Sequence, residues 1–435
     1  MPELVPARVR REAKDSLAAG AARACFRRGR FWVLFPPEKV PRRPQGGESF
    51  AVNEAPAEPV AVWQGHWRLA TMCDSPWESP VGYRVTVLPG GKSFEVASGE
   101  SVLAGAGRAG LALPYSCLGG VCGSCKATLI SGRCSYPRLA PSALSAEERA
   151  HGDVLLCQAV PQTDLVISAR EVPSVADLPR RVLPARVISK QQLATDVMRL
   201  CLRTPSLDPL RWLAGQYLDV LLDQGRRRAF SIANAPHTSR DLELHIRRVP
   251  GGGFTQQVFD ALPIGSLLRI EGPLGTFVAR EHSERPILLL AGGTGFAPIK
   301  ALIEHFLHLG TRRNMHCYWG VRRPEEVYLP ELPDRFRAAH PGFDFQAVVS
   351  EPQPDDSSCY RQGPVHEAAL RDHPNLSEHD VYMSGPPPMI QAARQAFSAA
   401  GLPAEQLFYD SFEYAPDVLA AILAGRAGLL PDRAQ

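Results

Sequence analysis

Residues Leu113–Cys125 read Leu-Pro-Tyr-Ser-Cys-Leu-Gly-Gly-Val-Cys-Gly-Ser-Cys, and this stretch decides how the surrounding chain folds. Its cysteines are Cys117, Cys122 and Cys125, and a fourth, Cys157, follows in the string Leu-Leu-Cys-Gln. Four residues separate the first two cysteines, two residues separate the next two, and a long gap precedes the fourth. This spacing is typical of plant-type ligation of a [2Fe–2S] cluster. The loop glycines tolerate backbone angles that other residues resist, so the loop can curl around two irons.

Two other interpretations of these cysteines stay open. A structural zinc site usually takes its ligands as two Cys-x2-Cys pairs, and this spacing fits that pattern poorly. Unrelated buried thiols are the second alternative. Cys134 lies outside the spacing, and we interpret it as an ordinary thiol. The remaining five cysteines are scattered along the chain and are interpreted as small apolar residues.

The composition of the 435-residue chain excludes several classes of protein. Apolar residues make up 45% and charged residues 21%, which is typical of a globular protein. The net charge of +3 gives no strong field for nucleic acid or a membrane surface, and no apolar run is long enough to span a membrane. Ten cysteines in a chain of this length do not form a secreted disulfide framework, so we expect a reducing, cytoplasmic setting.

Working outward from the cysteine loop, patterning divides the chain into five segments and predicts an α/β multidomain protein. These are a poorly ordered extension (1–82, with Met72 as an alternative start), a [2Fe–2S] domain (83–172), an antiparallel barrel (180–282), a parallel doubly wound domain (284–413) and a tail (414–435) with a helix at Ala415–Gly425.

Each folded segment has its own pattern. In the first, strands are expected at Tyr83–Leu88, Ser93–Val96, Lys126–Ile130, Val154–Cys157 and Asp164–Ser168, with a helix at Ser101–Ala109 and a capping box at Ser145–Glu148. In the second, short apolar segments alternate with turns, as in a barrel. In the third, a continuous apolar strand at Ile287–Ala291 precedes a helical pattern, and further strands alternate with helices near Pro364–Arg371 and Pro387–Ala399.

Two short motifs in the barrel segment indicate a flavin site. Arg228, Ala229, Phe230 and Ser231 end a predicted strand, where an arginine can pair with a pyrophosphate, an aromatic ring can cover the flavin and a serine can bind its edge. A Gly-rich turn then leads into a helix at Gln256–Ala261, and free N–H groups at a helix start bind anions. The alternatives are a basic strand end and a plain turn. The further candidate cofactor contacts are His245, Ile246, Arg247, Gly252, Gly253 and Thr255.

A Gly-rich motif in the last segment indicates a nicotinamide site. The string Ala291-Gly-Gly-Thr-Gly-Phe-Ala-Pro298 joins a strand to a helix, where glycines let the backbone approach a pyrophosphate, although the alternative is a plain sheet–helix turn. The candidate residues are Gly292, Gly293, Thr294, Gly295, Pro298, Arg322, Ser384 and Gly385, and Phe412 is a further candidate contact of the flavin. Arg322 and Arg323 favour NADPH, whereas Glu325 and Glu326 favour NADH, and solvated loop charge is the third alternative; we expect NADH.

In this order, and together with Tyr318–Arg322, Tyr382–Met389 and the terminal segment Asp410-Ser-Phe412, the motifs resemble the ferredoxin–NADP⁺ reductase superfamily with an N-terminal plant-type ferredoxin domain. The strings LPYSC…GSCK, LLCQA and RAFSIAN are most similar to the CDP-6-deoxy-Δ3,4-glucoseen reductase type and to reductase components of bacterial aromatic-ring oxygenases. The resemblance implies a β-grasp ferredoxin domain, a flavin barrel and a nicotinamide domain. Phe230 replaces the family's usual Tyr, and Ser384 replaces its usual Cys.

The resemblance also implies a function. NADH or NADPH would deliver two electrons to FAD, which would pass them singly to the [2Fe–2S] cluster and on to a redox partner protein, a dehydratase or an oxygenase component. Ser231 and Ser384 are the candidate catalytic residues. No acid–base pair is needed, so His151, His245 and His366 are interpreted as structural or surface residues. A non-catalytic redox sensor is the alternative from another class.

Overall fold

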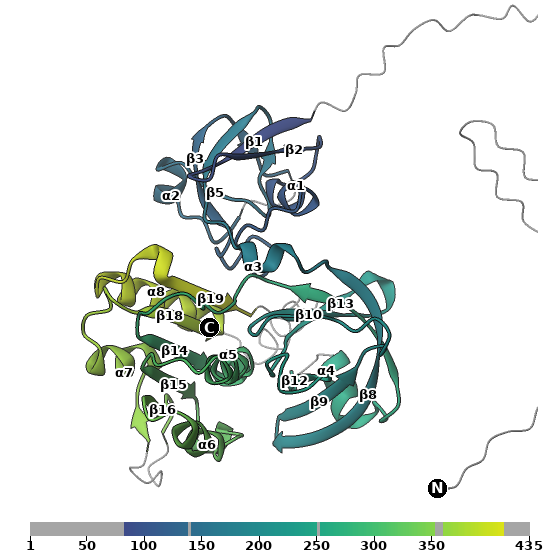
Figure 1. Cartoon of the computed structure of the whole chain (residues 1–435), viewed down its shortest axis with the longest axis vertical. Helices are drawn as coiled ribbons and strands as arrows, with labels where there is room; N and C mark the ends of the chain where they lie inside the picture. The colour runs from purple at the N-terminus through teal and green to yellow at the C-terminus, as the bar shows by residue number, and fades with distance from the viewer. Residues whose placement is uncertain (1–81, 138–140, 250–252, 353–359, 413–435) are drawn as a thin grey trace, which may run out of the picture. The chain divides into compact units, whose positions relative to one another are not determined.

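The computed structural model describes residues 82–137, 141–249, 253–352 and 360–412 (Figure 1). The chain divides into two units, Met1–Asp74 and Ser75–Gln435, and every described residue belongs to the second. The predicted extension up to residue 81, the tail 414–435 and the helix at Ala415–Gly425 lie outside the described residues.

The first part of the second unit is a small mixed sheet with the strand order β2-β1-β7-β3-β5. The first strand pairs antiparallel with its hairpin partner and parallel with β7, as in a β-grasp fold. The predicted capping box is confirmed, because Ser145 and Glu148 each bind the other's backbone N–H. The elements are β1 (Tyr83–Leu88), β2 (Lys92–Val96), α1 (Val102–Arg108), β3 (Lys126–Ser131), β4 (Cys134–Ser135), α2 (Ala146–Ala150), β5 (Asp153–Leu155), β6 (Val160–Pro161), β7 (Leu165–Ser168) and α3 (Pro173–Ala176).

Strand β5 ends two residues earlier than predicted. We expected a strand over Val154–Cys157, but β5 ends at Leu155 and the next residues form a turn in which Gln158 N donates to Leu155 O, at 3.0 Å. Leu156 and Cys157 continue an apolar pattern because they are buried, not because they are extended. Cys157 therefore approaches the cysteine loop from a turn.

The second part is a six-stranded antiparallel barrel, as predicted, with the order β11-β10-β13-β8-β9-β12. An antiparallel bridge from Ile232 to Leu244 brings its two outer strands together. Leu200, Leu218, Val220 and Leu244 are fully buried in its interior. The elements are β8 (Arg181–Ala194), β9 (Val197–Arg203), β10 (Tyr217–Leu221), η1 (Asp223–Gly225), β11 (Arg227–Ser231), β12 (Leu242–Arg247), α4 (Gly253–Asp260) and β13 (Leu267–Leu274).

The third part is a parallel sheet with the order β17-β16-β15-β14-β18-β19, which confirms the doubly wound prediction. All six residues of the central strand β14 are buried, because separate apolar cores cover its two faces. The elements are β14 (Ile287–Gly292), η2 (Gly293–Gly295), α5 (Phe296–His308), β15 (Met315–Val321), η3 (Pro324–Glu326), α6 (Leu332–Ala339), β16 (Phe343–Val349), β17 (Arg361–Gln362), α7 (Val365–Asp372), β18 (Asp380–Gly385), α8 (Pro387–Ala399), η4 (Ala404–Gln406) and β19 (Leu407–Ser411).

Helix α6 and strand β17 had no counterpart in the sequence prediction. Parallel strands bring their carboxyl ends to one edge, so the loops after β14 and β18 are neighbours. None of the helices in the described ranges is both long and apolar enough to cross a membrane.

Candidate functional site

The four predicted cluster cysteines lie together as two pairs. The side chain of Cys117 interacts with that of Cys122, and the side chain of Cys125 interacts with that of Cys157. Within the described ranges, no three His, Cys, Asp or Glu side chains converge as they would on a single metal ion. Two thiol pairs suit a cluster of two irons, each taking two thiolates, better than one tetrahedral zinc ion.

The loop backbone adapts to these thiols. Leu118 adopts a left-handed conformation with φ of 57°, which is unusual for a residue with a side chain, and Gly120 and Gly123 both have φ of 81°. Loop N–H groups point inward: Gly119 N lies 3.3 Å from Cys117 Sγ. The Cys122 thiol and these loop N–H groups lower the pKa of Cys117, and the same contact together with burial raises the pKa of Cys122.

Hydrogen bonds fasten both ends of the loop to the rest of the unit. Tyr115 N donates to Thr276 Oγ1 at 2.8 Å, and the Tyr217 hydroxyl donates to Ser116 O at 2.6 Å. Farther along, the Ser124 hydroxyl donates to the backbone oxygen of Tyr409 at 3.4 Å. The loop is therefore held by the barrel and by β19.

The two flavin motifs are brought together across the barrel. Arg228, Ala229, Phe230 and Ser231 lie on β11, and the Phe230 ring packs against Phe254 of α4, with centroids 5.7 Å apart. Helix α4 begins at Gly253, earlier than predicted, and buries Thr255, whose Oγ1 accepts a hydrogen bond from Val249 N at 3.2 Å. Gly252 lies outside the described residues.

Strand β12 carries three further predicted contacts. The His245 ring is buried, and its nitrogens lie 2.8 Å from Glu243 Oε1 and 3.1 Å from the Tyr328 hydroxyl. Burial lowers its pKa, so the ring is neutral at pH 7. Both ring nitrogens are occupied by protein groups, which fits the structural role suggested for this histidine. Ile246 is fully buried in the barrel core.

Arg247, the third residue, lies at the nicotinamide loop. A Cβ built on Gly293 would come within 3.6 Å of its Nη2. Its Nη1 lies 3.0 Å from Glu326, whereas Nε and Nη2 are buried without a hydrogen-bond partner in the described part of the chain. Buried donors of this kind are normally satisfied, so a bound anion fits beside them.

The nicotinamide loop is a tight backbone cradle. Gly293 has φ of 53°, and its carbonyl accepts a 2.8 Å hydrogen bond from the Trp319 indole. A Cβ on Gly295 would meet Ser384 O at 2.1 Å, and one on Gly292 would meet Met389 Sδ at 2.5 Å. Thr294 follows Gly293 in the same turn, and Pro298 is buried in the first turn of α5. Helix α5 begins directly after this turn at Phe296, whose N–H donates to the carbonyl oxygens of Gly293 and Thr294. Pro298 has no N–H, so Ala297 has the free N–H closest to the helix start.

Ser384, Gly385 and Phe412 meet beside that cradle. The Phe412 N–H donates to Gly385 O at 3.1 Å. Ser384 is fully buried, and its hydroxyl has no hydrogen-bond partner among the residues described. An unpaired buried hydroxyl next to a glycine cradle fits a site that a polar ligand completes.

The Arg322 guanidinium, expected to bind a 2′-phosphate, is paired with a carboxylate instead. Its Nη2 lies 3.0 Å from Glu326 Oε1, and the other Glu326 oxygen accepts from Arg247, also at 3.0 Å. Glu326 is mostly buried, and it neutralises the arginine that was expected to favour NADPH.

Sequence reasoning missed Asp410, although it belongs to the quoted terminal segment. Asp410 is buried and accepts hydrogen bonds from Ser116 Oγ at 2.5 Å and from Ser231 Oγ at 3.2 Å. Its partners are 294 and 179 residues away, so no local pattern signals the contact.

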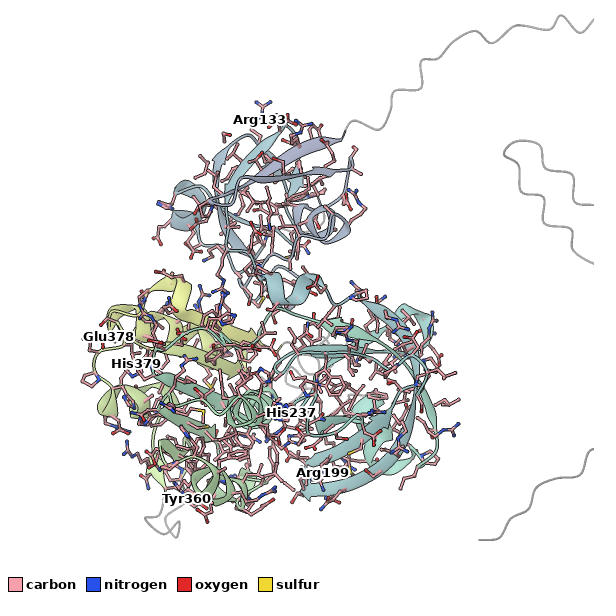
Figure 2. The ribbon with its side chains drawn as sticks, viewed as in Figure 1. Arg133, Arg199, His237, Tyr360, Glu378 and His379 are labelled. Carbon is pink, nitrogen blue, oxygen red and sulfur yellow. The ribbon has the colours of Figure 1, made fainter. Side chains whose placement is uncertain are left out.

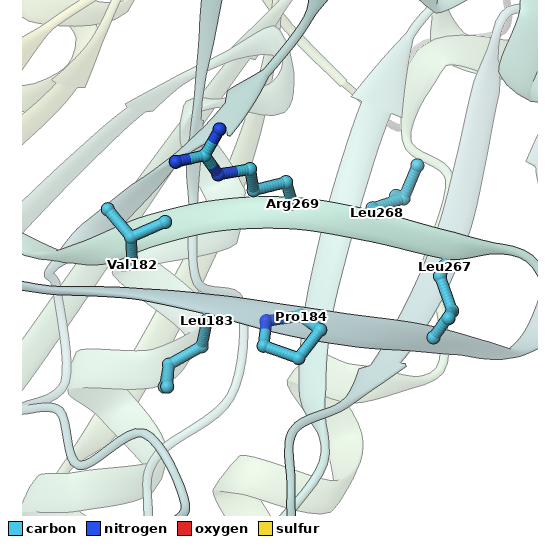
Figure 3. A pocket seen from close by; sticks show the side chains of 6 residues that line it. All are labelled: Val182, Leu183, Pro184, Leu267, Leu268 and Arg269. Carbon is cyan, nitrogen blue, oxygen red and sulfur yellow. The ribbon is translucent and has the colours of Figure 1, made fainter. Parts of the chain in front are cut away.

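The sequence prediction also missed the contact between the barrel and helix α5. Buried Lys300 donates to Ala233 O at 3.0 Å and pairs with Glu304 at 2.7 Å. His237, labelled in Figure 2, stacks on His308 with ring centroids 3.8 Å apart. A separate hollow on the barrel between β8 and β13 contains none of the candidate residues (Figure 3).

Comparison with known proteins agrees with this geometry. Family models match residues 85–162 as a 2Fe-2S iron-sulfur cluster binding domain, 184–278 as an oxidoreductase FAD-binding domain and 289–395 as an oxidoreductase NAD-binding domain. The cluster is therefore the [2Fe–2S] type, and the zinc and unrelated-thiol interpretations are set aside.

Two curated relatives cover the same region. The Yersinia pestis CDP-6-deoxy-L-threo-D-glycero-4-hexulose-3-dehydrase reductase is 37% identical over 329 residues, which is 75% of this chain and 98% of the relative. Reductase component 2 of a Comamonas terephthalate 1,2-dioxygenase is 36% identical over 327 residues, 74% of this chain and 95% of the relative.

A solved structure has a similar fold. The crystal structure of an Amycolatopsis cytochrome P450 reductase matches with a TM-score of 0.62 and 33% identity, covering 76% of this chain and 98% of that one. With these domains in this order, the chain belongs to the NAD(P)H-dependent iron–sulfur flavoprotein oxidoreductases of the ferredoxin reductase superfamily.

Proposed function

We propose that this protein draws electrons from NADH and delivers them one at a time to a partner enzyme that acts on a CDP-linked deoxy sugar. The observation that carries the proposal is the meeting of all three motif groups at β18 and β19. Ser384 pairs in register with Asp410, which binds Ser231 of the flavin motif and Ser116 of the cysteine loop.

Each group of residues has a role in this proposal. Arg228 and the start of α4 bind the flavin pyrophosphate, Phe230 and Phe412 cover the flavin, and Ser231 binds the edge of its ring. The cradle at Gly292–Gly295 and the start of α5 bind the nicotinamide pyrophosphate, with Ser384 beside the reacting ring. Cys117, Cys122, Cys125 and Cys157 hold the cluster. When bound, nicotinamide supplies an electron pair, FAD splits it and the cluster carries single electrons.

NADH is the donor we propose, because Glu326 already pairs with Arg322 and Arg247. A 2′-phosphate would have to displace this carboxylate, whereas a ribose hydroxyl would not. The reducing cytoplasm is the compartment we propose, since all seven cysteines in the described ranges are free thiols.

The acceptor is inferred from the relatives. A dehydratase acting on a CDP-6-deoxy sugar is our first choice, and an aromatic-ring oxygenase component is the second, since relatives of both kinds align over nearly their whole length. Anaerobic stopped-flow mixing of the holoprotein with NADH tests the first half of the proposal. Flavin bleaching followed by cluster reduction is expected; no bleaching within seconds would favour the redox sensor.

Purified dehydratase and oxygenase candidates then test the second half. The reduced holoprotein is mixed with each candidate, and reoxidation of the cluster is followed. Faster reoxidation by the sugar dehydratase is expected. Reoxidation by the oxygenase component alone would overturn the choice of acceptor while leaving the reductase assignment in place.

A further inference from the structure

The Asp410 carboxylate joins two parts of the site that the sequence keeps far apart. Its Oδ1 accepts from Ser116, the residue directly before the cluster ligand Cys117, and its Oδ2 accepts from Ser231, the last residue of the flavin motif. One side chain therefore connects the cysteine loop to the flavin strand.

The setting of this carboxylate is unusual for a charged group. Asp410 is 6% exposed, and no Arg, Lys or His forms an ion pair with it within the described ranges. A buried carboxylate without a cation is unfavourable unless its oxygens accept hydrogen bonds, and here the two serine hydroxyls donate to it. Its stability in this position therefore depends on the two segments that it connects.

Other hydrogen bonds hold the cysteine loop in place independently of Asp410, so the effect of Asp410 can be tested without unfolding the loop. The Tyr217 hydroxyl holds the backbone oxygen of Ser116 at 2.6 Å, and Tyr115 is held at Thr276. Removing the Ser116 hydroxyl leaves these anchors in place. Such a change loosens the link to Asp410 without releasing the loop from the barrel.

We propose that Asp410 is a positioning residue that holds the cysteine loop against the flavin strand and so sets the rate of electron passage from flavin to cluster. This inference rests on the proposed function. In that step one electron leaves the reduced flavin and one ferric ion becomes ferrous. A second electron would follow after a one-electron partner protein had reoxidised the cluster, and the flavin would then release the single proton that arrived with the hydride of NADH.

The inference predicts that the two electron-transfer steps respond differently to mutation. Electron tunnelling weakens steeply with distance, so a small displacement of the loop slows the second step, while reduction of the flavin by NADH does not involve the loop. Small misplacements of reacting groups cost rate on the order of ten- to a hundred-fold. Ser116→Ala should therefore slow cluster reduction on the order of tenfold and leave flavin reduction unchanged.

The experiment uses holoprotein carrying both FAD and the cluster, mixed anaerobically with NADH in a stopped-flow instrument. The variants are Ser116→Ala, Ser116→Thr, Asp410→Asn and the double variant Ser116→Ala/Asp410→Asn. Asp410→Asn should slow cluster reduction by a similar factor, and the double variant should be no slower than Asp410→Asn, because both changes break one link. Ser116→Thr keeps the hydroxyl and should restore the wild-type rate.

The matched control is Thr128→Val, which removes another hydroxyl–carboxylate hydrogen bond, 3.0 Å long, to Asp153 within the small sheet. It should alter neither step. Hydrogen–deuterium exchange over residues 113–125 gives a readout that does not depend on turnover, and faster exchange is expected in Ser116→Ala and Asp410→Asn. If Ser116→Ala fails to hold the cluster, Asp410→Asn and Ser116→Thr still carry the test.

Two results would overturn the inference: wild-type cluster reduction and loop exchange in both single variants, or rate losses that multiply in the double variant. A wild-type protein whose flavin NADH does not bleach would instead contradict the proposed function, so the two failures are distinguishable.

Discussion

At the scale of single residues, the polar groups that lack protein partners mark the ligand site. The Ser384 hydroxyl and two Arg247 nitrogens are buried without hydrogen bonds in the part of the chain described. Leaving one buried polar group unsatisfied costs about 1–3 kcal/mol, so a fold retains few of them without a use. Both residues border the glycine cradle of the nicotinamide domain.

Ser384→Ala tests the first of these residues. We expect the rate of flavin reduction by NADH to fall on the order of tenfold, because a hydrogen bond made at the reacting ring is lost. The melting temperature should stay the same or rise, since an unsatisfied hydroxyl is removed. Stopped-flow kinetics and thermal melts measure the two effects. A lower melting temperature with an unchanged rate would show that the hydroxyl is structural.

Glu326→Gln tests the choice of nucleotide. Removing the carboxylate releases Arg322 from its ion pair, while Arg247 keeps its pair with Asp196 at 3.3 Å, so the preference for NADH over NADPH should fall on the order of tenfold. The measurement is kcat/KM with each nucleotide. Glu325→Gln is the matched control, because the neighbouring Glu325 is exposed. An equal shift in both variants would contradict the assigned role.

At the scale of elements, the turn between β14 and α5 is defined by close backbone packing. Gly295 has φ of −60°, which any residue adopts, so the requirement for glycine there comes from space alone. A side chain would collide with the carbonyl group of Ser384 on β18. The pyrophosphate cradle and the strand that carries Ser384 therefore determine each other's position.

Gly295→Ala should separate those two elements. Forcing a methyl group into this packed contact is expected to destabilise the protein by about 1–3 kcal/mol and to weaken NADH binding. Chemical denaturation and nucleotide titration measure these losses. Gly107→Ala in α1 is the control, because a Cβ there meets nothing within 4 Å, and it should be neutral or stabilising. Equal stability of the two variants would exclude the packing argument.

At the scale of the whole molecule, buried polar contacts join the parts of the Ser75–Gln435 unit. Lys300 on α5 reaches the barrel at Ala233, and the cysteine loop reaches β19 through Ser116 and Ser124. Electron transfer requires the three cofactors at short, constant distances. Buried hydrogen bonds between the parts keep these distances more constant than flexible linkers would.

All candidate residues lie beyond Tyr83, so a chain that starts at Met72 should keep both chromophores. The expected result is unchanged flavin and cluster absorbance, with unchanged reduction by NADH, after removal of residues 1–71. Visible spectra of the full-length and shortened proteins measure it. Loss of either chromophore would show that the first 71 residues are needed to build the site.

The sequence alone determined the architecture and the order of the cofactor sites, because cysteine spacing, Gly-rich turns and apolar periodicity are local signals. Where local signals mislead, the prediction failed: apolar Leu156 and Cys157 suggested a strand but are buried in a turn. Only the tertiary structure decided that Asp410 binds both Ser116 and Ser231, and that Glu326 neutralises Arg322. The Asp410 partners come together through packing across 179 and 294 residues. In the case of Glu326, its neighbour Glu325 has the same charge, and only the fold shows which carboxylate meets the arginines.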